Sequence, residues 1–301
     1  MKFFAAGPWR PAFMLDFAQR PSRPGSYKDR QRPMRSAPIP FILVLALGLA
    51  ACGRSPWAPP AAPAAGGQQA DDGDGGYRAP PRVRQAVRGA DGDVTLSGVS
   101  LPGALMRLSS PSGGVQQTTA DGAGAWSLPT QAGPPAIYGL SQETGGRRDQ
   151  AQGYVVVLPG PGLTAAELRS GAGAMVLAGG PGAVKVNAVD FDASGAAVIS
   201  GWARPNQPLR VMVDGAAADE GAALASGRFF LALPKPLVAG KRMVSVVSQG
   251  GQDQVEVDAT PAQPFQGAMR AVQYGAAWRI DWMTPAGGGQ TTVLFGAGAG
   301  S

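Results

Sequence analysis

Apolar and polar residues alternate in short runs along most of the chain beyond residue 90. Residues 94–97 read Val-Thr-Leu-Ser, residues 106–108 read Met-Arg-Leu, and residues 126–128 read Trp-Ser-Leu. Turn-forming residues separate these runs, among them Asp-Gly-Ala-Gly at 121–124. Alternation with a period of two, interrupted by turns roughly every 8–12 residues, is typical of β-sandwiches and barrels. We therefore predict an all-β fold.

The same pattern recurs 103 residues later. Aligning residues 97–128 with residues 200–231 without a gap gives seven identities in 32 positions. Arg107 aligns with Arg210, and in both copies this arginine lies between apolar positions that belong on the inward face of a strand. The conservative apolar pairs are Leu96 with Ile199, Met106 with Leu209, Leu108 with Val211, and Trp126 with Phe229. The chain thus contains an internal repeat.

Each copy follows the order strand, glycine, proline turn, strand, glycine-rich turn and aromatic strand. This order resembles the compact bacterial Ig-like and carboxypeptidase-regulatory-like β-sandwich modules of secreted proteins. The resemblance implies two small Ig-like sandwiches, which we place at residues 91–148 and 189–250. It also implies a role as a spacer or adhesive module, since such modules carry no chemistry of their own.

Two further segments complete this part of the chain. Residues 149–188 are expected to connect the modules with β structure and a short helix, because Thr164-Ala165-Ala166-Glu167 reads as a capping box that opens a helix through Arg169. Residues 251–301 are expected to form a C-terminal β meander and a tail. The three expected meander strands cover residues 270–274, 278–283 and 291–295.

A short apolar run ends at the only cysteine of the chain. Residues 41–51 are eleven consecutive apolar residues after the basic Arg35. They are too few to cross a bilayer, which needs about 20 helical residues, and they match the apolar region of a secretory signal. The following Leu49-Ala50-Ala51-Cys52 resembles the lipobox of bacterial lipoproteins. That resemblance implies cleavage between Ala51 and Cys52 and a lipid on the Cys52 thiol.

The lipobox divides the N-terminal region into three parts. Residues 34–51 are expected to be the signal peptide, and residues 1–33 an over-extended start, with translation beginning at Met34. Residues 52–90, rich in Pro, Ala and Gly, are expected to be a tether, because they cannot bury enough apolar area to offset the entropy of ordering. The lipoprotein resemblance also implies outer-membrane placement facing the periplasm, because Gly53 stands where an Asp favours inner-membrane retention.

Charge and composition exclude several classes of function. The net charge of +6 comes entirely from residues 1–51, which hold eight basic and two acidic residues, because 18 basic and 18 acidic residues remain beyond them. The mature part therefore offers no electrostatic basis for nucleic-acid binding. The chain has no histidine and one cysteine, which excludes Ser-His-Asp triads, Cys-His dyads, histidine metal sites and intrachain disulfides.

A few side chains remain as candidate sites. Trp278 and Trp282 share one face of a predicted strand and could stack on a sugar ring, although packing into a core is the commoner fate of such a pair. The loop holding Asp214, Asp219 and Glu220 could offer oxygen ligands to calcium, but a solvated loop explains it more simply. Asp190 and Asp192 read as turn formers, and Gly160-Pro161-Gly162 as a tight turn rather than a phosphate loop.

These observations favour a lipid-anchored, non-enzymatic protein of the cell envelope that acts as a spacer, scaffold or binding module. Its expected partners are the membrane, through the covalent lipid at Cys52, and an envelope protein or glycan. No cofactor and no metal are expected. The first alternative is a lipoprotein that binds carbohydrate or peptidoglycan through exposed Trp278 and Trp282. The second is an envelope hydrolase that uses carboxylates alone.

Overall fold

The computed structural model describes residues 77–131, 133–160, 162–163 and 165–296. The predicted start, signal peptide and lipid site, with Ala51 and Cys52, lie outside these residues. Nineteen strands and no helix occur in the described part. No helix there has the length and apolar character needed to span a membrane. Contacts divide the chain into Met1–Gln68 and Gln69–Ser301, and all described residues belong to the second unit.

The first sandwich consists of a three-stranded and a larger sheet. The small sheet has the order β1-β2-β5, with β1 at Arg82–Arg88, β2 at Val94–Val99 and β5 at Ala125–Thr130. The facing sheet has the order β4-β3-β6-β7-β8-β9. Its strands are β3 (Leu105–Ser109), β4 (Val115–Thr119), β6 (Ala136–Thr144), β7 (Arg147–Val157), β8 (Ala165–Leu168) and β9 (Met175–Val176).

The second sandwich repeats this arrangement with strands β10 to β16. One sheet has the order β14-β11-β10-β19-β18-β17, and the other has the order β13-β12-β15-β16. The strands of the first are β10 (Lys185–Asp192), β11 (Ala197–Trp202), β14 (Arg228–Ala232), β17 (Met269–Tyr274), β18 (Ala277–Met283) and β19 (Gly289–Phe295). Those of the second are β12 (Pro208–Val213), β13 (Ala216–Ala222), β15 (Lys241–Ser248) and β16 (Gly251–Asp258).

Both sandwiches have the strand order of an immunoglobulin-like domain. Strands one, two and five pair in one sheet, and strands four, three, six and seven pair in the other, all antiparallel. Seven strands in two packed antiparallel sheets is the immunoglobulin-like architecture. The predicted all-β fold with tandem Ig-like sandwiches is therefore confirmed.

The internal repeat extends to individual hydrogen bonds. Adding 103 to both partners of a turn bond in the first sandwich gives the matching bond in the second. Ser100 N donates to Gly124 O at 2.8 Å, as Ala203 N does to Gly227 O at 2.8 Å; Ala120 N donates to Ala104 O at 2.9 Å, as Ala223 N does to Gln207 O at 3.0 Å. The first two strands of each sandwich also carry a register shift at matching positions.

A glycine allows the same close packing in both copies. A Cβ on Gly98 would lie 2.0 Å from the carbonyl oxygen of Arg82 and 2.7 Å from the Trp126 ring. A Cβ on Gly201 would lie 1.9 Å from the carbonyl oxygen of Lys185 and 2.8 Å from the ring of the residue that aligns with Trp126. Only a residue without a side chain leaves room for an aromatic ring against this strand.

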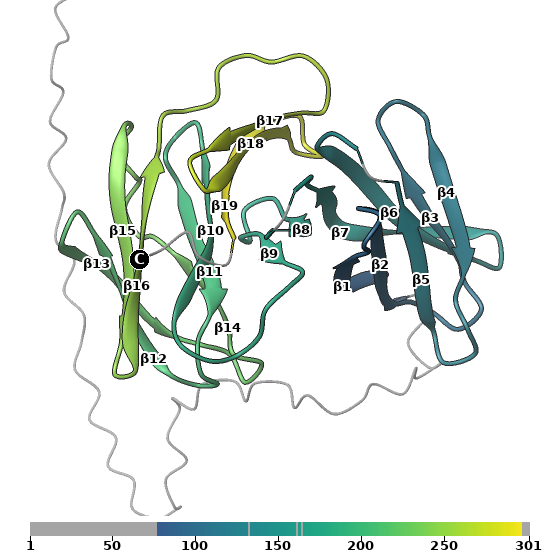
Figure 1. The fold of residues 1–301 in the computed structure, drawn as a ribbon, viewed down its shortest axis with the longest axis horizontal. Coiled ribbons are helices and arrows are strands. Elements are labelled where there is room, and N and C mark those ends of the chain that lie inside the picture. Colours follow the sequence, from purple (N-terminus) through teal and green to yellow (C-terminus); the bar gives the residue numbers. More distant parts are fainter. Residues whose placement is uncertain (1–76, 132, 161, 164, 297–301) are drawn as a thin grey trace, which may run out of the picture. The chain divides into compact units, whose positions relative to one another are not determined.

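Three hydrophobic cores hold the unit together. One lies inside each sandwich, and the third joins β6 to β9 of the first sandwich to β10, β18 and β19 of the second. Figure 1 shows β8 and β9 in teal between β7 and the yellow β19. The buried members of this third core are Ile137, Val156, Leu158, Leu163, Ala166, Leu168, Ala174, Val176, Ala188, Ile280, Trp282 and Leu294. The inner sheet of each sandwich is therefore covered on both faces.

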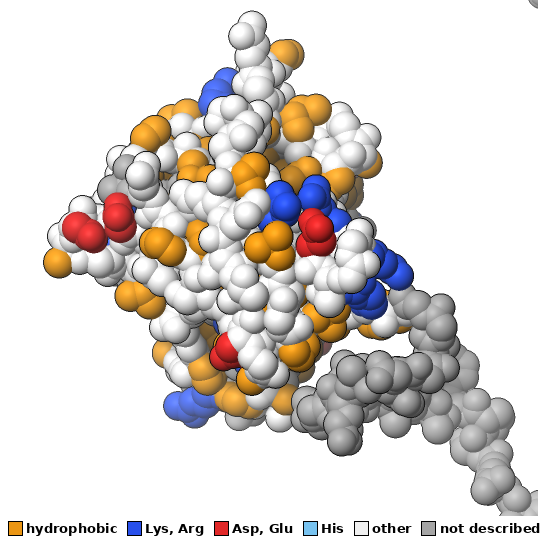
Figure 2. Space-filling view, turned by 90° about the vertical axis from the view of Figure 1, so that its right-hand side faces the viewer, with side chains coloured by type: hydrophobic (Ala, Val, Ile, Leu, Met, Phe, Trp, Pro, Cys, Tyr) orange, Lys and Arg blue, Asp and Glu red, His pale blue; other side chains and the backbone are white. Residues whose placement is uncertain are grey.

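Alternation along β7 explains how one strand serves two cores. Val155 and Val157 point into the first sandwich, whereas Val156 and Leu158 point into the third core. Side chains of a strand alternate between its two faces, so a strand buried on both faces reads as an apolar run. Outside the cores, hydrophobic side chains lie in small groups among polar atoms on the face shown in Figure 2.

The structure corrects three local predictions. The helix expected over residues 164–169 is wrong, because β8 pairs with the edge of β7 and buries all four of its side chains between two cores. Residues 82–88 form β1 rather than the end of the tether. The first sandwich consequently runs from Arg82 through β7, beyond the predicted limits of 91 and 148, and β10 and β16 extend the second sandwich past 189 and 250. The predicted three-stranded meander is present as β17 to β19.

Candidate functional site

A buried chain of hydrogen bonds crosses three strands where the sandwiches meet. The indole Nε1 of Trp282 on β18 donates to the hydroxyl of Thr292 on β19 at 3.1 Å. That hydroxyl donates to Oδ1 of Asp190 on β10 at 2.5 Å. Oδ2 of Asp190 accepts the backbone N–H of Ala174 at 2.8 Å. The relay thus ties the segment after β8 to the sheet of the second sandwich.

A register shift in β10 sets the direction of the Asp190 side chain. The shift lies between Val186 and Ala188 in the pairing with β11. Beyond it, Val189 and Phe191 enter the core of the second sandwich, so the intervening Asp190 points to the opposite face. Pairing with β19 places Asp190 directly opposite Thr292.

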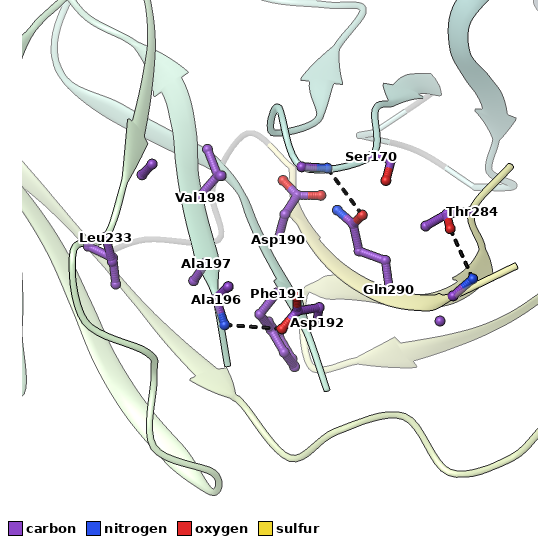
Figure 3. A pocket seen from close by; sticks show the side chains of 14 residues that line it. Ser170, Asp190, Phe191, Asp192, Ala196, Ala197, Val198, Leu233, Thr284 and Gln290 are labelled. Atoms are coloured by element: carbon purple, nitrogen blue, oxygen red, sulfur yellow. Dashed lines mark hydrogen bonds between the residues drawn. The ribbon is translucent and has the colours of Figure 1, made fainter. Parts of the chain in front are cut away.

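Two more hydrogen bonds hold the same segment. Gln290 Oε1 accepts the N–H of Gly171 at 3.4 Å, and the Ser200 hydroxyl donates to the Ala174 carbonyl at 2.7 Å. A cavity of about 370 Å³ lies next to these bonds. Figure 3 shows the side chains of Asp190 and Gln290 side by side at this cavity, with Asp192 farther along the same strand.

Asp190 and Asp192 have opposite electrostatic environments. Burial raises the pKa of Asp190 to about 6, and the hydrogen bonds from Thr292 and Ala174 only partly oppose this. The pKa of Asp192 is lowered, chiefly because the Ser194 hydroxyl donates to its carboxylate. Two carboxyl groups with pKa values pushed apart at one cavity are a pattern found in acid–base catalysis.

The geometry of the pair favours a structural role. A catalytic carboxyl group must come within hydrogen-bond reach of the proton that it transfers. Asp190 is 1 % exposed, and both of its oxygens already accept hydrogen bonds from the chain. Asp192 accepts bonds from Ser194 and Ala196 and closes the turn after β10, as predicted. The prediction that Asp190 forms a turn is wrong, because it lies inside β10 and holds a junction.

The structure removes Trp282 as a stacking platform. Its side chain is 0 % exposed, and its ring packs edge-on against Tyr154 with 6.0 Å between centroids. Trp278 is half-buried and packs against the same third core. The prediction that these tryptophans share a strand face is confirmed, but a second sheet covers Trp282, so a sugar ring cannot stack on it.

The acidic loop of the second sandwich is held by ion pairs. Asp214 pairs with Arg242 at 3.2 Å, and Glu220 pairs with Arg210 at 2.8 Å. Within the described ranges, no group of three or more acidic, cysteine or histidine side chains is placed to hold a metal ion. These contacts agree with the simpler interpretation of a solvated loop.

Sequence reasoning missed the relay. The available signal was an aspartate between Val189 and Phe191, where a surface turn would not place two large apolar residues. A carboxylate within such a run predicts a buried acid that needs donors from elsewhere in the fold. The donors Thr292 and Ala174 lie 102 and 16 residues away, so no local pattern identifies them.

No protein-family model and no curated protein matches the chain. Three solved structures share similarity with it. They are a central fibronectin-III array of RIM-binding protein (15 % identity, TM-score 0.23, 70 % of this chain and 74 % of that one), a BSP domain of a biofilm-associated protein (14 %, 0.21, 61 % and 30 %) and invasin, a bacterial integrin-binding protein (12 %, 0.20, 71 % and 54 %). At these scores the similarities carry no argument about function, and the Ig-like fold is established by the strand order.

Proposed function

We propose that this chain is a lipid-anchored, non-enzymatic protein of the cell envelope, which acts as a rigid spacer, scaffold or binding module. The observation that carries the proposal is the third core, which fuses two Ig-like sandwiches into one body. Covalent lipid on Cys52 would hold this body at the outer membrane on the periplasmic side. The segment after Cys52, up to β1, would serve as its tether.

The fused body suits a scaffold. Domains joined only by a linker normally move relative to one another, unless their interface is large and hydrophobic. Here the interface buries large apolar side chains such as Trp282 and Ile280 from one sandwich against Val156 and Leu168 from the other. The relay through Asp190 adds directional contacts. Such a body keeps its binding surfaces at fixed distances from each other.

The lipobox motif supports the anchor. One acyl chain gives only marginal membrane binding, at about 0.8 kcal/mol per buried CH₂, whereas two or more chains hold a protein stably. The lipoprotein resemblance implies a diacylglyceryl group on the Cys52 thiol and an acylated amino terminus. These groups would suffice to anchor a folded part that carries no membrane-crossing helix in its described residues.

Membrane fractionation combined with intact-mass measurement tests the anchor. The wild-type protein should be membrane-bound, begin at Cys52 and carry acyl mass. Cys52→Ser should be unprocessed or released. A soluble wild-type protein without acyl mass would contradict the proposal.

A matched variant tests the placement. Gly53→Asp should remain lipidated but move from the outer to the inner membrane fraction of a density gradient, if sorting follows the lipoproteins that the motif resembles. A wild-type protein already in the inner-membrane fraction would refute the outer-membrane assignment and leave the anchor itself intact.

A further inference from the structure

A groove lies between the first strand of one sandwich and the edge of the other. Arg84, Gln85 and Ala86 of β1 line it on one side, and Trp202 and Arg228 on the other. Residues 177–179 complete the lining, and the volume is about 430 Å³. We name this cavity the β1 groove. Its size lies within the range of small-ligand sites, roughly 300–1,000 Å³.

The guanidinium group of Arg228 is held in place inside the groove. Its central carbon lies 4.1 Å from the centroid of the Trp202 ring, and Nη2 donates to the Val176 carbonyl at 3.2 Å. Trp202 is itself fixed, because its Nε1 donates to the Ala178 carbonyl at 3.3 Å. Stacking and one hydrogen bond orient the planar group, while its further N–H donors are left for a ligand.

Gly179 makes this packing possible. Its φ is +84°, a conformation that favours glycine, and a Cβ there would lie 3.1 Å from Trp202 Nε1. On the opposite wall, the register shift between Val83 and Gln85 leaves Arg84 as the extra residue of β1. Extra residues of this kind re-aim side chains at the edge of a sheet. Backbone geometry thus places one arginine on each wall.

Positive charge around the groove is not neutralised by ion pairs. Ten basic side chains of the described residues form ion pairs with carboxylates. Arg82, Arg84, Arg169 and Arg228 are not among these ten. Glu167 is the acid that interacts electrostatically with Arg82, Arg169 and Arg228, and burial raises its pKa. Four guanidinium groups therefore share one buried carboxyl group.

We propose that the β1 groove binds a small anionic ligand of about monosaccharide size, which Arg84 and Arg228 hold through its carboxylate or phosphate group. A guanidinium presents a rigid fork of donors that matches both of these groups. The groove leaves room for a sugar-sized body beside the charged group. This inference goes beyond the proposed envelope function and does not depend on lipidation, so either can fail without the other.

Calorimetric titration of the purified full chain at low ionic strength tests the proposal. The probes are glucuronate, glucose 6-phosphate, neutral glucose and inorganic phosphate. Binding of glucuronate, glucose 6-phosphate or both, at least tenfold tighter than glucose, supports the proposal, and the two probes distinguish a carboxylate from a phosphate site. Absence of binding by both anionic sugars overturns it. Inorganic phosphate binding as tightly as glucose 6-phosphate overturns the assignment of a sugar-sized ligand.

Three variants locate the site. Arg228→Lys keeps the charge but loses the fork, and it should weaken binding at least fivefold. Arg84→Gln changes an exposed side chain, so it should weaken binding at least threefold with an unchanged unfolding temperature. Lys235→Gln is the matched control, because it removes an exposed charge beyond the far end of β14, and it should change the affinity less than twofold. Equal effects of Lys235→Gln and Arg84→Gln would overturn the proposal.

Discussion

Asp190→Asn should change how the stability of the protein depends on pH. The pKa of Asp190 is about 6 in the folded protein, against 3.8 for an ordinary aspartate. The folded state therefore binds the proton more tightly, and the contribution of Asp190 to stability is complete below pH 3.8 and lost as the pH rises to about 6. At about 1.4 kcal/mol per pKa unit, the ionised carboxylate costs about 3 kcal/mol at neutral pH. The asparagine variant does not titrate and avoids this loss.

Urea unfolding at fixed pH values, followed by tryptophan fluorescence, measures the effect. The free energy of unfolding of Asp190→Asn minus that of the wild type should rise by up to about 3 kcal/mol between about pH 3.5 and pH 7. Asp192→Asn is the matched control, because the pKa of Asp192 is lowered. Its corresponding difference should fall as the pH rises from the acidic end. A pH-independent difference for Asp190→Asn, or the same sign for both variants, would refute the assigned burial of Asp190.

Two further predictions concern packing and the relay, and the same unfolding assay checks both. Gly98→Ala and Gly201→Ala should each lower the free energy of unfolding by about 2 kcal/mol or more, because the new Cβ would lie 2.0 or 1.9 Å from a carbonyl oxygen; Gly139→Ala, with open space around it, should stay within about 0.5 kcal/mol of the wild type. Thr292→Val should cost about 1–3 kcal/mol and more than Trp282→Phe, because it leaves both the indole N–H and the Asp190 carboxyl group without a partner. A smaller cost for Thr292→Val than for Trp282→Phe would contradict the relay.

The sequence predicts the parts of this fold that depend on local patterns. Alternation and turn residues are enough to identify the all-β class, and the 103-residue repeat aligns strands that later prove to share hydrogen bonds. The helix expected at Ala165–Leu168 fails because a capping box is a local signal, whereas β8 is stabilised by pairing with β7 and by two cores. Residues 82–88 were assigned to the tether because their two buried side chains, Val83 and Ala86, are few and three positions apart. The register shift in β1 explains this spacing.

The candidate site depends on contacts that no local pattern contains. Alternation correctly places Trp278 and Trp282 on one face of β18, but whether that face meets water or another sheet depends on strands β7 and β8, more than 100 residues earlier. Similarly, Asp190 faces the junction only because a register shift precedes it. Packing between distant segments thus decides whether the same residue is a ligand platform, a turn former or a structural group.

The junction and the β1 groove are linked by one short segment. Ala174 is fixed by Asp190, and residues 177–179 line the groove only a few positions later. One groove wall belongs to the first sandwich through Arg84 and the other to the second through Arg228, so the distance between these arginines depends on the third core. Two sandwiches joined by a loose linker could not hold two guanidinium groups at a spacing that suits one small anion. The buried core and relay that make this chain a rigid body are therefore also what would make the groove a defined site.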